Sequence, residues 1–387
     1  MQTMFTLPTL VYFGRGVSRQ LVPLLENQEA KRIFLVSDPG VRTAGLLDAP
    51  LNGLQEAGLQ VRLFAEVLPN APDFQVDAAA EQARDFGADA FVSIGGGSSM
   101  DTAKAANILL ANPGPLRRYD GLNLVPKPGL PHIAIPTTAG TSSELTVAAV
   151  ISDEKNKKKM VFFGRNVAAS IALIDPELTY GLPPALTAST GMDALTHAME
   201  AYISTAASPV TDALAPEAIA LIAAGLPLAY RNGADTEARD KIMLGCQLAG
   251  CCFSNTGLGI VHSMAHPMGA HCHVPHGLAN AICLAVGMRY SMSRVPGHKI
   301  RRMAEALGLK TENRGEEVLG PAICSTLKTL TETLRIPTIA QAGVTKDKIP
   351  VMAEDSLKEL STVTTPRQPT AGEVAALYRE LFAHAGQ

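Results

Sequence analysis

AFVSIGGGSSMDTAKAANILL, residues 90–110, joins a short β-rich apolar run to a cluster of glycines and then to a helix-like stretch. Glycines mark tight turns, so Gly95, Gly96 and Gly97 with Ser98 indicate where a strand ends and a helix begins. A strand that leads directly into a helix is the repeating unit of parallel sheets. The segment therefore predicts an α/β fold.

The same alternation of strand-like and helix-like segments extends over the chain ahead of Leu182. Helix-like stretches such as LLDAPLNGLQEAG (46–58) and VDAAAEQARDFG (76–87) lie between most of the apolar runs. These runs are nearly continuous in apolar residues, so we expect a mostly parallel, Rossmann-like sheet covered by helices on both faces. The predicted strands are RIFLVS (32–37), VRLFAEV (61–67), AFVSIGG (90–96), HIAIPTT (132–138) and IALID (171–175).

Beyond GLPPAL (181–186) the pattern changes, because strand signals nearly vanish and helical signals dominate. A chain of 387 residues is long for a single core, so two domains are expected. We place the boundary near Leu182, with an α/β domain over residues 1–182 and an all-α helical domain over residues 183–387. A functional site is expected in the cleft between two such domains.

The overall composition argues against several classes of protein. Hydrophobic residues make up 47% of the chain, charged residues 18%, and the net charge is −3, which is ordinary for a soluble globular protein. No basic patch is present, so nucleic-acid binding is not expected. The N-terminus lacks the pattern of a signal peptide, and the apolar stretch 218–230 is too short to span a bilayer. No membrane association is therefore expected.

The cysteines indicate a reducing compartment. Six are present, and they form neither a C-x-x-C pair nor the pattern of a secreted domain. We interpret them mainly as buried thiols in the cytoplasm. Cys272 stands apart, because it lies inside a histidine-rich segment.

The glycine turn at Gly96, Gly97 and Ser98 is a candidate phosphate site. Backbone N–H groups can approach a phosphate closely there, and a helix N-terminus adds unpaired donors and partial positive charge. Asp101 and Lys104 follow one and two turns into the helix. The spacing is not the G-x-G-x-x-G of the common dinucleotide fingerprint, so a simple tight turn fits the segment as well. Its position at the carboxyl end of a parallel strand favours ligand binding.

Two further features are compatible with a dinucleotide. Asp38 ends the predicted strand RIFLVSD, where a carboxylate can accept bonds from the ribose of NAD and repel the 2′-phosphate of NADP. It could equally cap the turn that follows. PTTAGTSSE (136–144) follows another strand with a run of hydroxyls, which could donate to a phosphate or ribose or form a polar surface loop.

A carboxylate and several histidines gather in two segments of the helical half. Asp193 and His197 are four residues apart in GMDALTHAMEAYIS, which places both on one face of a helix. His262 and His266 share this spacing, and His276 follows in VPHGLAN, where the next residue, a glycine, permits a turn.

The surroundings of these histidines favour a metal site. Five of the nine histidines fall within residues 262–276, among Gly, Met, Ala and Val and not among charges, which argues against a solvated patch. A single helical histidine is usually structural, but several imidazoles together with a carboxylate suit Fe²⁺ and Zn²⁺ alike. A divalent metal is therefore predicted.

The chain resembles the iron-containing (group III) alcohol dehydrogenase family, which includes lactaldehyde reductase and 1,3-propanediol dehydrogenase. The resemblance covers essentially the whole chain. It runs through GGGSSMDTAK, PTTAGTSSE, ALTASTGMDALTHAMEAYIS, NTGLGIVHSMAHPMGAHCHVPHGLAN and TTPRQPT. It implies a dinucleotide-binding first domain, a metal-binding helical second domain, and hydride exchange between NAD(H) and a small primary alcohol, diol or aldehyde.

The resemblance also implies roles for individual residues. The metal ligands would be Asp193, His197, His262 and His276, with Fe²⁺ favoured over Zn²⁺. His266 matches a histidine near the nicotinamide that is not a ligand, and it could relay a proton in catalysis. Together with Gly96 and Asp101 of the glycine segment, the matching positions for NAD are Asp38, Asn70, Gly97, Ser98, Thr137, Thr138, Thr141 and Lys159.

Three departures from the family pattern concern the surroundings of these residues. Ser99 stands where the family often has proline after GGGS, and Ala285-Val286 replace a frequent Pro-His. His271, Cys272 and His273 lie between the second and third histidine ligands, where aromatic or small residues are common. Candidates for the substrate pocket are Ala148, Phe253, His271 and Cys272. The family commonly forms homodimers or larger homo-oligomers.

Three alternatives remain at this point. A metal-dependent lyase or synthase like the dehydroquinate synthases shares the broad architecture and binds NAD. A metal-independent reductase is disfavoured by the carboxylate and three histidines. A non-catalytic NAD-binding or scaffold protein has no need of four converging ligands.

Overall fold

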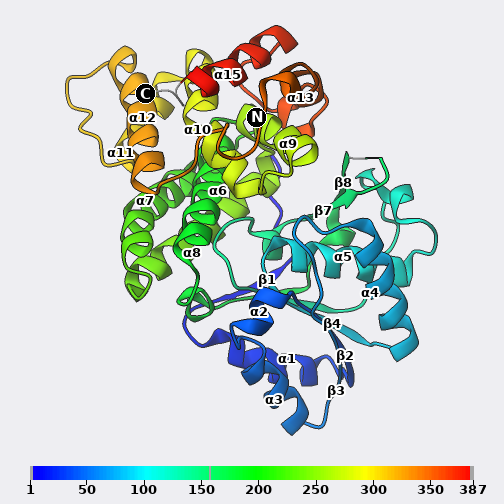
Figure 1. The fold of residues 1–387 in the computed structure, drawn as a ribbon. Coiled ribbons are helices and arrows are strands. Elements are labelled where there is room, and N and C mark those ends of the chain that lie inside the picture. Colours follow the sequence, from blue (N-terminus) through cyan, green and yellow to red (C-terminus); the bar gives the residue numbers. More distant parts are fainter. Residues whose placement is uncertain (1–2, 157, 384–387) are drawn as a thin grey trace. The chain divides into compact units, whose positions relative to one another are not determined.

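The structure is a computed structural model that describes residues 3–156 and 158–383. The chain divides into two compact units, one over residues 7–181 and one over residues 182–383, and the second also includes residues 3–6. In Figure 1 the first unit runs from blue to blue-green and the second from green to red.

Within residues 7–156 and 158–181, six parallel strands form the main sheet, in the order β1–β9–β6–β4–β2–β3. The strands are β1 (Leu10–Phe13), β2 (Arg32–Val36), β3 (Gln60–Phe64), β4 (Ala90–Gly95), β6 (His132–Pro136) and β9 (Ile171–Ile174). Five of them correspond to the predicted strands, so the prediction of a parallel α/β sheet is confirmed. β1, a short and partly exposed edge strand, was not among the predicted strands.

Helices cover both faces of this sheet. They are α1 (Leu21–Asn27), α2 (Pro39–Thr43), α3 (Asp48–Glu56), α4 (Asp73–Phe86) and α5 (Gly97–Ala111). Ile33 and Leu35 of β2 belong to the core that includes residues of α1 and α3. Phe34 and Val36 belong to the core shared with α4 and α5. Successive residues of β2 thus point to opposite faces and are all buried, which explains the unbroken apolar run.

A small three-stranded sheet also belongs to the first unit and was not predicted. Its order is β5–β8–β7, with β5 (Gly121–Leu122) parallel to β8 (Lys158–Phe163) and β7 (Ala148–Asp153) antiparallel to it. Burial alternates along β8, whose sequence starts with two lysines and continues with four apolar residues.

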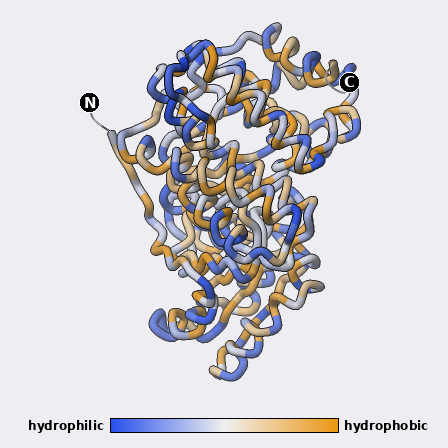
Figure 2. Tube along the Cα trace, turned by 90° about the vertical axis from the view of Figure 1, so that its left-hand side faces the viewer, coloured by the Kyte–Doolittle hydropathy of each residue, from blue (hydrophilic) through white to orange (hydrophobic). Residues whose placement is uncertain are grey.

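Within residues 182–383 all the assigned secondary structure is helical. The prediction of an all-α second half is therefore confirmed. The α-helices are α6 (Pro184–Ile203), α7 (Pro209–Arg231), α8 (Thr236–Thr256), α9 (Ile260–Cys272), α10 (His276–Ser291), α11 (Gly297–Ala306), α12 (Glu316–Thr333), α13 (Ile349–Ser356), α14 (Leu360–Val363) and α15 (Ala371–Ala383). Hydropathy alternates along many helical turns, as one-sided burial requires (Figure 2).

The helix α7 is long and apolar enough to cross a membrane by length and composition alone. It has 23 residues, and an 18-residue stretch within it has a mean hydropathy of 1.6. Of that stretch, 44% is buried. The bent pair α8 and α9 passes the same test only when taken together. Because α7 packs along α6 and α8 within its unit, a core helix accounts for the same features.

Candidate metal and dinucleotide sites

The helix α6 presents two candidate metal ligands on one face. Asp193 and His197 lie one turn apart, and their exposed fractions are 1% and 3%. Nearly all of α6 from Gly191 to its end is buried, so packing fixes these side chains. A carboxylate in such surroundings requires compensating partners.

The other two candidate ligands come from the next pair of helices. His262 lies in the first turn of α9, and His276 is the first residue of α10. His273 adopts a left-handed conformation with φ of 57° at the end of α9, and Pro275 precedes α10. This short connection returns the chain so that His276 faces His262, with ring centroids 5.3 Å apart.

Gly277 has a role that differs from the expected turn. It lies inside α10, and a Cβ atom there would be 2.6 Å from the backbone oxygen of Ser189 in α6. The sequence interpretation of Gly277 as a turn residue was therefore wrong. Its lack of a side chain allows α10 to approach α6 and brings His276 beside Asp193.

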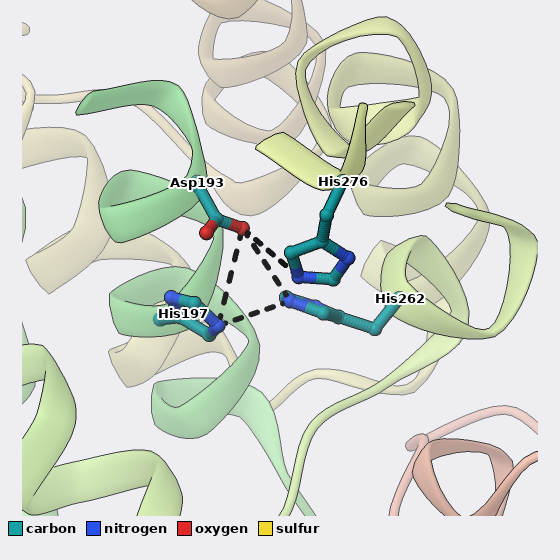
Figure 3. Close-up of side chains that lie close together, drawn as sticks. All are labelled: Asp193, His197, His262 and His276. Atoms are coloured by element: carbon teal, nitrogen blue, oxygen red, sulfur yellow. Dashed lines mark hydrogen bonds and ion pairs between the residues drawn. The ribbon is translucent and has the colours of Figure 1, made fainter. Parts of the chain in front are cut away.

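The four ligand atoms converge on one point (Figure 3). Oδ1 of Asp193 lies 4.0 Å from Nε2 of His197, 3.8 Å from Nε2 of His262 and 3.5 Å from Nε2 of His276. The Nε2 atoms of His197 and His262 are 3.1 Å apart, and all four atoms lie within 4.8 Å of one another. Ligands bound tetrahedrally at 2.0–2.2 Å would be separated by about 3.3–3.6 Å. The spacing therefore fits a divalent metal.

Electrostatics at this group favour the metal-binding form of histidine. Burial lowers the pKa of His262 well below its usual value, and the nearby His197, His276 and His266 lower it further. A neutral imidazole is the form that coordinates a metal.

Asn280 also lies at this group. Its Nδ2 lies 2.6 Å from Oδ1 of Asp193, 3.0 Å from Nε2 of His262 and 3.2 Å from Nε2 of His276. The side chain is fully buried, and its Oδ1 accepts no hydrogen bond from the described residues. The amide nitrogen of Asn280 thus contacts three of the four candidate ligand atoms.

His266 lies beside this group but is not one of its four members. It follows His262 by one turn of α9, and its ring stacks on that of His276 with centroids 5.3 Å apart. Its Nδ1 is 2.7 Å from Oε2 of Glu359, and both side chains are partly exposed. The structure therefore places His266 between a candidate ligand and an acidic residue.

The residues expected to line a substrate pocket lie in different surroundings. Phe253 stacks on His197, with ring centroids 4.2 Å apart and an interplanar angle of 17°. His271 has its Nε2 2.7 Å from Oδ2 of Asp355. Cys272 is partly buried, which raises the pKa of its thiol. Ala148 belongs to β7 of the first unit. Phe253 is thus in contact with one of the candidate metal ligands.

In the first unit, Asp38 and the glycine turn meet at a topological switch point. The chain passes from β2 to β3 on one side and then to β4 on the other. In open α/β sheets, ligands bind outside the carboxyl ends of strands at such a point. Oδ1 of Asp38 accepts the N–H of Val41 at 3.0 Å and caps α2, while Oδ2 accepts the hydroxyl of Ser99 at 2.9 Å. Asp38 thus caps the turn and also faces the glycine segment.

The hydroxyl-rich segment after β6 packs on the glycine turn. A Cβ atom on Gly97 would lie 2.8 Å from Oγ1 of Thr141, and one on Gly96 would lie 3.4 Å from Oγ1 of Thr138. The N–H of Thr137 donates to the carbonyl oxygen of Gly95 at 3.0 Å. The structure therefore brings together the predicted cofactor residues of these two segments.

Asn70, Ser98 and Lys159 form a second set of contacts at this edge. The N–H of Asn70 donates to Oγ of Ser98 at 3.1 Å, and the carbonyl oxygen of Asn70 is 3.4 Å from Nζ of Lys159. Lys159 also donates to Oγ of Ser152 at 2.7 Å. Burial lowers the pKa of Lys159 to about 8, although Asp101 and Glu154 act in the opposite direction.

Asp101 is bonded within the protein. Its carboxylate accepts the hydroxyl of Ser143 at 2.5 Å and the N–H of Val150 at 3.0 Å. The buried Lys104 donates to the carbonyl oxygens of Ser143 and Ala148 at 2.5 and 2.8 Å. These contacts brace the segment after β6, and a direct role of Asp101 in cofactor binding stays a prediction.

Three residues that contact predicted site residues were not predicted from the sequence: Glu200, Asn280 and Glu359. Two of them carried a signal in their spacing. Glu200 follows Asp193 by seven residues, and Asn280 follows His276 by four, so each shares a helical face with a candidate ligand. Glu359 is distant in sequence from His266 and had no such signal.

Comparison with known proteins defines the class. The family model described as "Iron-containing alcohol dehydrogenase" matches residues 8–176, and that described as "Fe-containing alcohol dehydrogenase family, C-terminal" matches residues 187–382. The chain belongs to the iron-containing alcohol dehydrogenase family. It is an oxidoreductase of alcohols and aldehydes, and the resemblance inferred from the sequence motifs is confirmed.

Individual relatives match over nearly their full length. Lactaldehyde reductase of Escherichia coli (strain K12) is 37% identical over 95% of this chain and 96% of its own. The NAD-dependent methanol dehydrogenase of Bacillus methanolicus is 36% identical over 97% of this chain and 99% of its own. A crystal structure of 1,3-propanediol oxidoreductase is 36% identical, with a TM-score of 0.96, and the match covers 99% of this chain and 100% of that one.

Proposed function

We propose that this chain interconverts small primary alcohols or diols and their aldehydes, with the hydride exchanged with NAD(H) and Fe²⁺ held by Asp193, His197, His262 and His276. The observation that carries the proposal is the convergence of these four ligand atoms within 4.8 Å of one another, in a chain of the iron-containing family. Zn²⁺ fits the same donor set, and the family favours Fe²⁺.

The bound metal would supply Lewis acidity toward the substrate oxygen. Three imidazoles and one carboxylate leave a net positive charge when they hold a divalent ion. His197, packed on Phe253, is held rigidly on one side of the group. His266 and Glu359 handle the proton: their side chains are 2.7 Å apart and partly exposed, so a proton can pass between them toward solvent.

The first domain, residues 1–182, would bind NAD at the switch point. The N-terminus of α5, with Gly96, Gly97 and Ser98, is suited to the pyrophosphate. Asp38 would accept ribose hydroxyls and disfavour NADP. Support comes from the relative that is named an NAD-dependent methanol dehydrogenase. The remaining predicted contacts are Asn70, Asp101, Thr137, Thr138, Thr141 and Lys159.

The proposal also includes a cytoplasmic homodimer or larger homo-oligomer, without nucleic-acid or membrane partners. All six cysteines are free thiols, as expected in a reducing compartment. Light scattering of the purified protein gives its oligomeric state.

The test combines metal analysis with a substrate panel. The protein is purified anaerobically, its metal content is measured, and short aldehydes are assayed with NADH and with NADPH. We expect iron near one equivalent per chain and aldehyde-dependent oxidation of NADH. His262→Ala should lose metal and turnover together. Full turnover of a metal-free His262→Ala protein would overturn the ligand assignment, and absence of turnover with every short aldehyde and alcohol would overturn the proposed substrate class.

A further inference from the structure

Glu200 is a buried carboxylate outside the candidate ligand group. Its exposed fraction is 1%, and it lies on α6. Together with Asp193 and His197 it follows the spacing i, i+4 and i+7, so the three side chains lie along one stripe of the helix. A buried carboxylate of this kind requires several partners.

The partners of Glu200 all come from the start of α9. Oε1 accepts the N–H of Val261 at 2.7 Å, and the N–H groups of His262 and Gly259 also point to the carboxylate. These backbone donors belong to the helix N-terminus, where no carbonyl of the same helix can accept them. Glu200 thereby joins α6, which carries two candidate ligands, to α9, which carries a third.

The side chain of His262 is part of the same arrangement. Its Nδ1 lies 2.6 Å from Oε2 of Glu200. Burial raises the pKa of Glu200 to about 7, against the backbone N–H groups that lower it, and the ionised carboxylate accepts a hydrogen bond from Nδ1–H. In a neutral imidazole the other nitrogen then carries the lone pair. That nitrogen, Nε2, is the atom that faces Asp193 and His197 at 3.8 and 3.1 Å. Only this tautomer directs a lone pair of His262 to the point on which the four candidate ligand atoms converge.

The backbone makes room for this carboxylate. A Cβ atom on Gly259 would lie 2.7 Å from Oε1 of Glu200. The residue before α9 therefore has no side chain where the carboxylate of Glu200 lies, and a larger residue there would displace that carboxylate.

We infer that Glu200 is a positioning residue of the metal site, which fixes the tautomer and orientation of His262 and ties α6 to α9. The inference rests on the proposed function, because it takes the four converging side chains to hold a metal. Carboxylates that accept the second ring N–H of a metal-binding histidine raise its basicity and orient it, and their loss lowers metal affinity by about 10- to 100-fold.

Zn²⁺ binding to the chelator-treated full-length protein tests this inference without any assay of turnover. Affinity is measured by competition with a chromophoric chelator for wild type, Glu200→Ala and Glu200→Gln. Asp235→Ala is the matched control, because Asp235 caps α8 through the N–H of Ala238 at 3.0 Å but contacts no candidate ligand. Circular dichroism establishes that each variant is folded.

We expect Glu200→Ala to weaken Zn²⁺ binding by about 10- to 100-fold, Glu200→Gln to weaken it less, and Asp235→Ala to leave it within about twofold of wild type. The Co²⁺-loaded variants at Glu200 should also show an altered visible spectrum. Wild-type affinity in both folded Glu200 variants, or an equal loss in Asp235→Ala, would overturn the inference while leaving the proposed function intact. Absence of stoichiometric Zn²⁺ binding by wild type would instead overturn the proposed metal site, and the inference with it. Should Glu200→Ala fail to fold, Glu200→Gln decides.

Discussion

The hydroxyl of Ser99 donates a hydrogen bond of 2.9 Å to Oδ2 of Asp38, which joins the carboxyl end of β2 to the first turn of α5. A proline at position 99 would have no side-chain donor for this bond. The other oxygen of Asp38 is engaged by the N–H of Val41 at 3.0 Å. The carboxylate proposed to recognise the ribose is therefore held from two sides.

Ser99→Ala should weaken the preference for NAD over NADP. A hydrogen bond to a charged acceptor contributes about 1.5–3 kcal/mol, and its loss frees the Asp38 carboxylate to turn away from the ribose. We expect the ratio of kcat/KM for the two dinucleotides to fall by about tenfold. The measurement is kcat/KM for NADH and for NADPH, each determined with the same aldehyde at the same concentration. Thr43→Ala, which removes an exposed hydroxyl of α2, is the control, and an unchanged ratio in Ser99→Ala would contradict the role given to Ser99.

Gly277→Ala should disrupt the metal site through the backbone. The new Cβ atom would meet the carbonyl oxygen of Ser189 at 2.6 Å, and a backbone atom inside a helix cannot move aside without shifting the helix. We expect a loss of about 1–3 kcal/mol in the free energy of unfolding, together with reduced metal content. Urea unfolding and elemental analysis measure the two effects.

Gly372→Ala provides the matched control, because no atom lies within 4 Å of a Cβ placed on Gly372 of α15. It should be neutral or slightly stabilising, since alanine favours a helix over glycine. Wild-type stability and metal content in Gly277→Ala would show that α10 can retreat from α6 without cost.

The sequence predicts those parts of the fold that depend on local pattern. β2 and β4 are buried on both faces, so their apolar runs are unbroken and easy to recognise. β1 and β8 are only partly buried, and their apolar runs LVYF and MVFF were not recognised as strands. The spacing of Asp193 and His197 likewise predicts a shared helical face without any knowledge of the tertiary structure.

Contacts between segments distant in sequence could not be predicted in this way. Gly277 looks like a turn residue in sequence, and its function becomes clear only when α10 is seen against α6. Glu359 meets His266 across 93 positions of the chain, and no periodicity connects them. Asp38 fits a turn cap and a ribose ligand equally well by sequence, and in the structure its two oxygens have separate partners.

The binding of the dinucleotide should weaken as the pH rises through about 8. Burial lowers the pKa of Lys159 to about 8. Its amino group is therefore positively charged below that pH and loses the charge above it. A phosphate group bound near Lys159 is stabilised only by the charged form. Lys159→Arg should abolish this dependence, because a guanidinium group stays protonated throughout the range. Titration of NADH fluorescence between about pH 7 and pH 9 measures the effect.

Lys158→Arg is the control for this pH dependence. Lys158 precedes Lys159 in β8, but its side chain is exposed and pairs with Asp120 at 2.8 Å. The control should retain the wild-type pH dependence. If Lys159→Arg also retained the wild-type pH dependence, the loss of dinucleotide binding at high pH would come from a group other than Lys159.

His266→Ala should slow turnover while leaving the metal bound. His266 lies outside the four converging ligand atoms, and its Nδ1 contacts Glu359 at 2.7 Å, so its removal takes away proton transfer without removing a ligand. General acid–base catalysis contributes about 10²- to 10⁴-fold, and we expect kcat to fall by about 10²-fold. Glu359→Gln should produce a smaller loss in the same direction, since the amide still contacts His266 but cannot accept a proton.

His298→Ala, at an exposed position in α11, is the control and should match wild type. Metal content is measured on every variant, and loss of the metal from His266→Ala would make His266 a ligand and not a proton carrier.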